Sequence, residues 1–354
     1  MSITTRTSFS ALRERALDEL VVGAVGAVAV AAFAVLFFAA PRYAVFPAVT
    51  LALAVGYGWV RDQAVTARAL TLLATVSTVL ILGLITVYLL VKALPTFQRM
   101  GLGLLVGGAP YWDPGSDVYV LGPMIWGTLV TTLIATAIAG PLGVAGAIFI
   151  AEIAPGRVRD VVKPAVEMLA GIPSIVYGFI GFNLINPAMM DYLEVSTLGS
   201  LFGVGVVIGV MALPTVVSVA EDAVTSVPAE LQDSALALGA TDWQTIRNVV
   251  VPASFSGLSA AVLLGVGRAI GETMAATVML GHVKEFPEPF YNVFGNTETL
   301  TTLIASQYGS ATGDASFTSA LFAAGVVLFV TVLVLSVASW RIERRMRARF
   351  GGEQ

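Results

Sequence analysis

The sequence predicts an all-α polytopic membrane protein, and three observations carry that prediction. Hydrophobic residues make up 57% of the 354 residues and charged residues only 12%, whereas soluble domains carry about 25% charged residues. The mean hydropathy is +0.87. The charged residues gather at the two ends and in a few short segments, which leaves runs of roughly 20 apolar residues, enough to cross a bilayer core of about 30 Å.

About eight transmembrane helices are expected from these runs. All must be helical, because backbone polar groups in lipid need partners within their own segment. The second run is short for a full span, and the fourth is longer than one straight crossing needs. The expected spans cover residues 20–40, 44–60, 70–93, 121–151, 164–187, 198–220, 253–281 and 317–340.

Lysine and arginine gather on one side of the predicted membrane. With an even number of spans, both terminal tails and the loops after the second and fourth spans fall on the same side. Because short loops rich in Lys and Arg stay in the cytoplasm, both termini of this multi-pass chain are expected on the cytoplasmic side of the cytoplasmic membrane. Lys163 and Glu167 lie four residues apart and are expected to form a surface ion pair. The basic residues of these tails and loops are Arg6, Arg13, Arg15, Arg61, Arg68, Arg157, Arg159, Lys163, Arg341, Arg344, Arg345, Arg347 and Arg349.

Several functional classes are excluded by what the sequence lacks. It has no Cys and one His, so neither a Cys-based metal site nor a His cluster can form, and no metal or cofactor is expected in this chain. No G-x-x-x-x-G-K-[ST] loop occurs, so ATP would have to be bound by a partner subunit. The formal charge of −4 argues against a nucleic-acid partner. Without a nucleophile–base set, the chain is not expected to be an enzyme by itself.

One polar stretch, residues 221–252, separates two of the apolar runs. It follows the sixth predicted span, so it is expected on the cytoplasmic side. It holds two short helical patterns, at 229–238 and 242–250. Gly239 lies between them, where a helix C-terminus favours glycine, and Asp242 is placed to cap the second. The pair could lie on the membrane surface, but an ordered loop of this length favours a docking element for a soluble partner.

The spacing within this stretch resembles the EAA loop of ABC importer permeases, written EAA-x3-G-x9-I-x-L-P. Val249 and Val251 stand in its two apolar places. In that family the loop forms coupling helices that insert into a cleft on the ATPase subunit, so the resemblance implies the same role here. The residues that would form the ATPase coupling loop are Asp233, Ser234, Ala235, Gly239 and Pro252.

Two further segments resemble the phosphate-specific permeases of this family. They are EMLAGIPSIVYGFIGF, from Glu167 to Phe182, and GRAIGETMAA, from Gly267 to Ala276. The second is more similar to the PstC-type subunit than to its PstA-type partner. The resemblance implies a MetI-like core of six helices in an ATP-driven importer of inorganic phosphate. It also implies a second permease of the PstA type, two ATPase subunits of the PstB type and an extracytoplasmic phosphate-binding protein of the PstS type.

The resemblance divides the chain into three parts. Residues 1–69 are expected to form an N-terminal tail and an extra transmembrane hairpin, residues 70–345 the permease domain, and residues 346–354 a C-terminal tail. The polar segments 95–120 and 282–316, on the side opposite the basic loops, are the expected docking surfaces for the external binding protein.

Arg268 and Glu272 are charged residues within an apolar segment, and their spacing predicts a shared helix face. A charge at the bilayer centre costs at least about 2.5–3.5 kcal/mol, so such residues face a partner or a cavity. The pair could be a self-neutralised structural contact. Alternatively, Arg268 faces the transport path, where its planar fork suits an oxyanion, and Glu272 holds it and limits how tightly the anion binds. The resemblance favours the path, because both positions match residues implicated in phosphate movement.

The residues themselves leave other functions open. A guanidinium fork suits sulfate and molybdate as well as phosphate, and only the family resemblance favours phosphate. An ion-coupled carrier would work without an ATPase and would need no docking loop. A signalling subunit that reports phosphate status would bind partners and move nothing.

Overall fold

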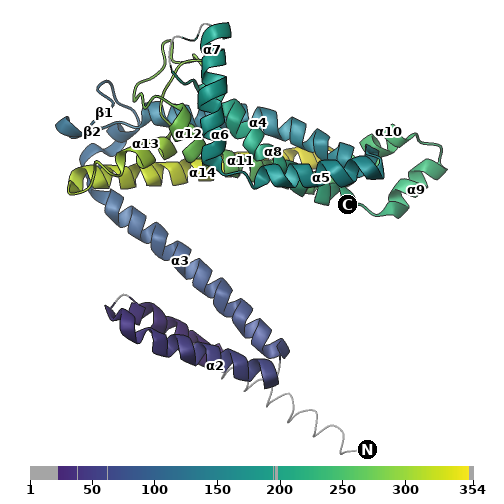
Figure 1. The fold of residues 1–354 in the computed structure, drawn as a ribbon, viewed down its shortest axis with the longest axis horizontal. Helices are drawn as coiled ribbons and strands as arrows, with labels where there is room; N and C mark the ends of the chain where they lie inside the picture. Colours follow the sequence, from purple (N-terminus) through teal and green to yellow (C-terminus); the bar gives the residue numbers. More distant parts are fainter. Residues whose placement is uncertain (1–22, 38, 62, 194, 196–197, 351–354) are drawn as a thin grey trace, which may run out of the picture. The chain divides into compact units, whose positions relative to one another are not determined.

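The protein is mainly helical in both of its compact units, which confirms the predicted all-α class (Figure 1). Contacts divide the chain into Met1–Tyr88 and Leu89–Gln354, and α3 (Gln63–Met100) runs through the division. The predicted boundary after residue 69 falls inside α3 and stays a prediction, as does the tail from 346, where α14 continues to Phe350. The computed structural model describes residues 23–37, 39–61, 63–193, 195 and 198–350.

Apolar helices occupy all eight predicted positions, although not all of them as straight spans. Within the described ranges, six helices are long and apolar enough to cross a membrane, or seven if one broken pair counts as a single span. A shorter apolar helix, Gly23–Phe37, lies at the first predicted position, of which residues 20–22 and 38 fall outside the described residues. The six long helices are Pro41–Arg61, Gln63–Leu104, Gly122–Ile153, Leu201–Thr225, Asp242–Ile270 and Ala315–Arg341.

The first unit exposes apolar side chains, as a lipid-facing segment should. A 3₁₀ turn, Pro41–Tyr43, leads into α2 (Val45–Arg61). Leu53 is 69% exposed and Val60 90% exposed. In water these side chains would be a liability, but lipid tails solvate them at little cost.

Four long helices form the core of the second unit and run alongside one another (Figure 1). Helices α4 and α8 pack closely where Gly205 faces Ile134, since a Cβ on this glycine would lie 2.7 Å from the isoleucine side chain. Small residues permit such close helix contacts in membranes, where packing rather than water exclusion drives association. The four helices are α4 (Gly122–Ile148), α8 (Leu201–Thr225), α11 (Val251–Ile270) and α14 (Ala315–Phe350).

The predicted span at 164–187 is wrong as a single helix. Helix α5 (Gly156–Ala170) ends inside this range, and the chain turns by 93° before α6 (Ser174–Ile180). Pro173, the N-cap residue of α6, explains the break, because a proline disfavours helical geometry in the residue before it. Beyond α6 the chain continues through a π-helical turn into α7 (Asn186–Leu193).

Prolines also explain three π-helical turns. A proline has no N–H for the carbonyl four residues earlier, and its ring crowds that carbonyl. Each π-helical turn includes the residue four positions before a proline and ends two residues before that proline. The turns are Phe149–Ile153 before Pro155, Gly181–Ile185 before Pro187 and Ile246–Val250 before Pro252.

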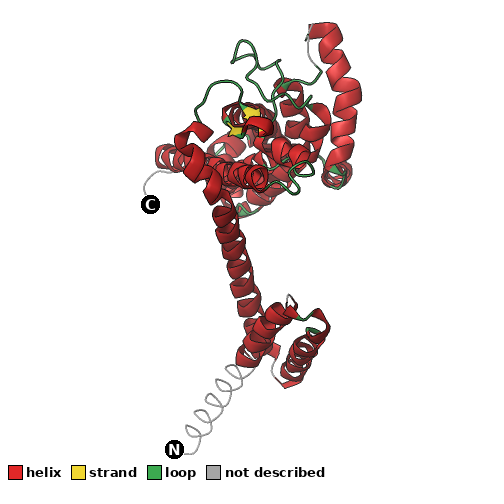
Figure 2. Cartoon of the chain, turned by 90° about the vertical axis from the view of Figure 1, so that its left-hand side faces the viewer, coloured by secondary structure: helices red, strands yellow, loops and turns green. Residues whose placement is uncertain are grey.

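A small strand pair, absent from the sequence prediction, lies between α3 and α4. Strands β1 (Trp112–Asp113) and β2 (Val118–Tyr119) are antiparallel and are the only strands among the described residues (Figure 2). Asp117 precedes β2, accepts a hydrogen bond from Ser316 at 2.7 Å and pairs with Arg99 at 3.1 Å. The Ser316 hydrogen bond and the Arg99 charge hold the pKa of Asp117 below its usual value.

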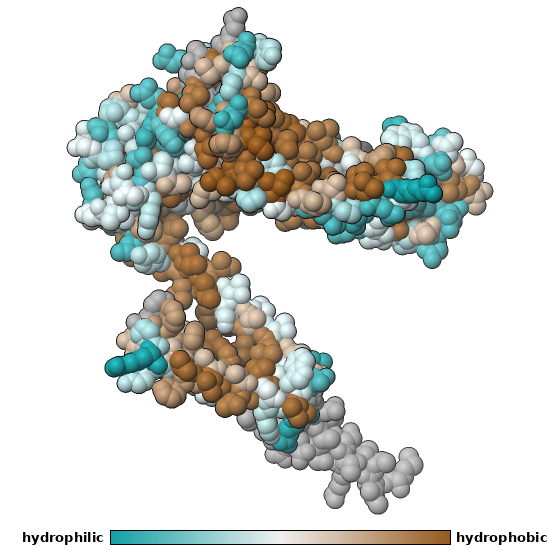
Figure 3. All heavy atoms as spheres, viewed as in Figure 1, coloured by the Kyte–Doolittle hydropathy of each residue, from teal (hydrophilic) through white to brown (hydrophobic). Residues whose placement is uncertain are grey.

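Polar groups gather at two opposite ends of the second unit (Figure 3). The hairpin end contains β1, β2, α12 (Met274–Met279) and α13 (Leu300–Gln307). The α9 end contains α9 (Ala229–Ala237) and α10 (Asp242–Thr245). Apolar side chains cover the surface between these ends.

Candidate transport path and coupling element

The helix that carries Arg268 ends sooner than predicted. The expectation of one helix face for Arg268 and Glu272 is wrong, because α11 stops at Ile270 with Gly271 as its C-cap. Glu272 lies in the break, and α12 begins at Met274. The apolar segment is therefore a broken helix, the kind of element that exposes backbone groups to a cavity in membrane transporters.

Arg268 lies in the last turn of α11 and is exposed. A cation is favourable there because the helix dipole leaves partial negative charge at the C-terminus. In the part of the chain that the structure describes, its guanidinium makes no hydrogen bond or ion pair, so all five donors can reach a ligand. Neither this region nor any other described part brings together three His, Asp or Glu side chains as a metal site.

Glu272 is half-buried, and its contacts stabilise the helix break instead of pairing with Arg268. Its Oε1 accepts a hydrogen bond from the N–H of Ala275 at 3.1 Å, so the carboxylate caps the start of α12. Its backbone carbonyl accepts a hydrogen bond from the Thr301 hydroxyl at 2.9 Å. Among described residues Glu272 forms no ion pair with Arg268. The structure therefore does not have the self-neutralised pair, which was one of the two alternatives for these residues.

The candidate coupling element, between α8 and the next long helix, is shorter than the predicted loop at 221–252. Helix α8 continues to Thr225, and the second predicted helix runs through its π-helical turn into α11, giving one helix from Asp242 to Ile270. Residues 226–241 remain, and they contain α9 and the turn after it. Gly239 lies in this turn with φ +88°, a conformation that L side chains rarely adopt.

Thr241 and not Asp242 is the N-cap of α10. The Thr241 hydroxyl accepts from the Gln244 N–H at 3.3 Å, and the Gln244 side chain accepts from the Thr241 N–H at 2.9 Å. This capping box satisfies two backbone donors at once. Asp242 is the first helical residue, where its negative charge suits the helix dipole.

Four of the five residues of the predicted coupling motif lie within residues 226–241, and Pro252 lies beyond them on α11. Asp233 and Ser234 are exposed on α9, Ala235 is half-buried, and Pro252 is exposed at the start of α11. The Ser234 hydroxyl donates to the Glu230 carbonyl at 2.6 Å.

The structure adds four exposed apolar side chains, on α9, the turn after it and α10, that the motif did not include. They are Leu231, Leu236, Leu238 and Trp243, which are 49%, 42%, 90% and 63% exposed. Large apolar side chains in an otherwise polar element mark a surface that a protein partner covers. Their apolar character within the polar stretch was the available sequence signal. We call these four residues the coupling patch.

Lys163 pairs with a residue on another helix, so the predicted ion pair with Glu167 is wrong. Its Nζ lies 2.8 Å and 3.0 Å from the two carboxylate oxygens of Glu221 on α8. The Glu221 side chain is 6% exposed and that of Lys163 41%. Packing of α5 against α8 brings the two together across 58 residues of sequence.

Comparison with known protein families decides the class. The family model described as "binding-protein-dependent transport system inner membrane component" matches residues 139–348. The chain belongs to this family.

Sequence relatives of this inner membrane component cover most of the chain. The probable ABC transporter permease protein YqgH of Bacillus subtilis is 40% identical over 249 residues, 70% of this chain and 80% of the relative. The phosphate transport system permease protein PstC of Mesorhizobium japonicum is 33% identical over 304 residues, 80% of this chain and 91% of the relative. A probable PstC of Methanocaldococcus jannaschii is 32% identical over 76% of this chain and 89% of its own length.

Solved structures show the same permease fold. A bacterial alginate ABC transporter, solved with an alginate-bound periplasmic protein, gives a TM-score of 0.54 at 17% identity over 82% of this chain and 98% of the other. The MetNI methionine ABC transporter in an inward-facing conformation gives 0.50 at 21% identity over 63% and 94%. These similarities confirm the predicted MetI-like fold.

Family membership fixes four general properties. This inner membrane component is a multi-pass membrane protein and a transport subunit of an ABC importer, not itself an enzyme. A binding-protein-dependent system includes an ATPase and a substrate-binding protein, so the chain has both kinds of partner.

Proposed function

We propose that this chain is a permease subunit of an ATP-driven importer of inorganic phosphate, and that Arg268 contacts the anion in the path. The observation that carries the proposal is an exposed guanidinium, without a partner among the described residues, at the end of a broken apolar helix. Relatives that are named phosphate transport permeases support this substrate.

Glu272 has a revised role in this proposal. It shapes the break that presents Arg268, and its charge near the path limits how tightly a phosphate anion binds. A transport site needs that limit, because an anion that binds too well does not leave. The half-buried carboxylate that caps α12 supports this role.

The remaining subunits follow from the same family relationship. The proposed complex contains this chain, a PstA-type permease, two PstB-type ATPase subunits that bind the ATP, and a PstS-type phosphate-binding protein outside the membrane. In this proposal the α9 end and both termini lie in the cytoplasm. In support, the C-terminal end of α14 lies at the α9 end, and its exposed Arg341 and Arg344 suit the cytoplasmic side (Figure 1).

Coupling in this proposal is mechanical. The ATPase moves the coupling patch as it binds and hydrolyses ATP, and α10 passes that movement to α11 because the two form one helix from Asp242 to Ile270. Arg268 lies in the last turn of that helix. Movement at α9 can therefore change the side from which Arg268 is reached.

The substrate is tested by uptake of labelled phosphate at micromolar concentration in cells that lack this gene and carry it on a plasmid. Restored uptake that excess sulfate or molybdate does not reduce would support phosphate. Uptake blocked by either oxyanion would keep the importer and change its substrate. Uptake that survives loss of the partner ATPase would instead favour an ion-coupled carrier.

Leu238→Asp is expected to release the ATPase from the permease. Leu238 is 90% exposed, so the change should leave folding within about 0.5 kcal/mol. At an interface the same change buries a charge without a partner, which costs about 2–5 kcal/mol. We expect the ATPase to be lost when the tagged permease is purified, together with at least about thirtyfold less uptake.

Leu102→Asp is the matched control for this variant. Leu102 is 81% exposed and lies in a 3₁₀ turn at the hairpin end. Its substitution should leave ATPase binding unchanged. Equal loss of the ATPase in both variants would mean that added charge, rather than the coupling patch, disturbs assembly.

A further inference from the structure

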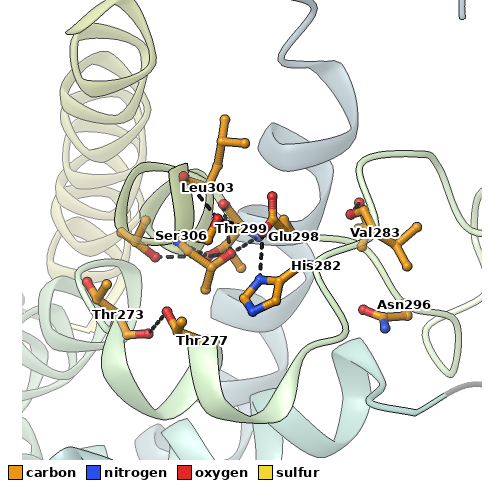
Figure 4. A network of polar contacts seen from close by, with 12 residues as sticks. Thr273, Thr277, His282, Val283, Asn296, Glu298, Thr299, Leu303 and Ser306 are labelled. Atoms are coloured by element: carbon orange, nitrogen blue, oxygen red, sulfur yellow. Dashed lines mark hydrogen bonds and ion pairs between the residues drawn. The ribbon is translucent and has the colours of Figure 1, made fainter. Parts of the chain in front are cut away.

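Glu298 is a fully buried carboxylate at the hairpin end. Its Oε1 lies 2.7 Å from Nδ1 of His282 and accepts a hydrogen bond from the Ser306 hydroxyl at 3.0 Å. Figure 4 shows these three side chains pointing toward one another. The Glu298 N–H also donates to the Val283 carbonyl at 2.8 Å. Burying a charge is unfavourable unless it is paired, so separating Glu298 from His282 would be costly. The contact therefore holds the segment after α12 against α13.

Thr301 makes the corresponding contact at the other end of α12. It is 7% exposed, and its hydroxyl donates to the Glu272 carbonyl in the helix break. Thr301 follows Glu298 by three residues; it lies in the first turn of α13, and Glu298 lies just before the N-cap residue of that helix. One short stretch of the chain therefore holds the segment just before α12 and the segment just after it. We call Glu298 and Thr301 the α13 clamp.

The contact that Glu298 makes with the segment after α12 lies near the protein surface. The His282 side chain is 42% exposed, its backbone has φ +56°, and its Nδ1 contacts Glu298. The residues that follow it surround an open cavity of about 500 Å³, lined in part by Val283, Glu285 and Asn296. A protein that docks on this segment pulls or pushes directly on the His282–Glu298 contact.

We propose that the α13 clamp positions Glu272 and carries the docking of the substrate-binding protein from segment 282–299 to the transport path. Glu298 and Thr301 are positioning residues, because neither lies at the proposed anion site. Since α12 is only six residues long and is held before its start and after its end, it moves as a rigid piece. A shift of the outer segment therefore displaces Glu272 relative to Arg268. This inference rests on the proposed function.

The first test removes the Thr301 hydroxyl while keeping its shape. In the complete complex, reconstituted with its ATPase, partner permease and binding protein, Thr301→Val should lower the maximal rate of labelled phosphate uptake about tenfold. The half-saturating concentration of the loaded binding protein should not change, because the docking surface is intact. Thr301→Ser, which keeps the hydroxyl, should restore most of the rate.

Thr318→Val is the matched control for loss of a threonine hydroxyl. The Thr318 hydroxyl donates to the Ala311 carbonyl at 2.9 Å, also at the hairpin end, but does not touch the break. It should retain the parent rate. An equal loss in both valine variants would overturn the proposal, as would full activity of Thr301→Val.

A second readout follows the path directly. The chain has no Cys, and a Cβ at Gly267, beside Arg268, would have no neighbour within 4 Å. In a Gly267→Cys variant, the loaded binding protein should change the rate at which a water-soluble thiol reagent labels this position. We expect that change to vanish when Thr301→Val is added. If the Thr301→Val complex does not assemble, Glu298→Gln is used in its place, and the same loss of the labelling change is expected.

The outcomes separate the two proposals. A wild-type complex that moves no phosphate refutes the proposed function. A wild-type complex that moves phosphate, with an unaltered labelling response in Thr301→Val or Glu298→Gln, refutes the clamp alone.

Discussion

Arg268→Ala is expected to reduce phosphate uptake by at least about thirtyfold while the complex still assembles and hydrolyses ATP. Truncating one side of a charge-assisted contact costs about 2–5 kcal/mol. Folding should be little affected, because Arg268 is exposed and has no partner among the described residues. The measurement is uptake of labelled phosphate into proteoliposomes, with ATP hydrolysis followed in the same preparation.

Two substitutions separate charge from geometry at this site. Arg268→Lys keeps the charge and loses the planar fork, so it should restore only part of the uptake. Glu272→Gln keeps an oxygen for the Ala275 N–H but removes the charge. If Glu272 limits how tightly the anion binds, this variant should retain phosphate longer and transport it more slowly. Full uptake by Arg268→Ala would mean that the guanidinium does not contact the anion.

The positions of the spans could be predicted from the sequence because lipid burial depends on local composition. The break at Gly271 could not be predicted in this way. The segment around Gly271 stays apolar on both sides, so the hydrophobic pattern continues where the helix stops. The helix ends at that glycine, and Glu272 then caps the next helix through Ala275. A spacing of four residues predicts a shared face only if the helix is continuous.

The candidate site could be predicted in part for a related reason. Arg268 stood out because a charge in an apolar run is costly. Glu298 and Thr301 lie in a polar segment, where polar residues are expected and carry no signal. Their role depends on contacts with His282 and Glu272, residues 16 and 29 positions away. Only the folded arrangement brings these together.

Lys163→Met is expected to destabilise the permease by about 2–3 kcal/mol. Removing one partner of a buried ion pair leaves the other charge without compensation, which costs about 3–5 kcal/mol when both partners are buried. Lys163 keeps 41% of its side chain exposed, which lowers that figure, whereas Glu221 is 6% exposed and would stay buried. The apparent Tm of the detergent-purified protein should fall by roughly 4–12 °C.

The double variant Lys163→Met/Glu221→Met should recover most of the lost stability, because it leaves no charge desolvated between α5 and α8. Asp117→Asn supplies a matched control, since the Arg99–Asp117 pair has exposed fractions of 42% and 54% and should change the Tm little. Equal Tm values for all single variants would show that the Lys163–Glu221 contact contributes nothing to stability. If the double variant regained the Tm but transported less phosphate than the wild type, the charge pair would have a role besides stability. Glu221 lies in the last turns of α8, ahead of α9, so the pair would then fix the end of α8 from which the ATPase-contacting segment extends.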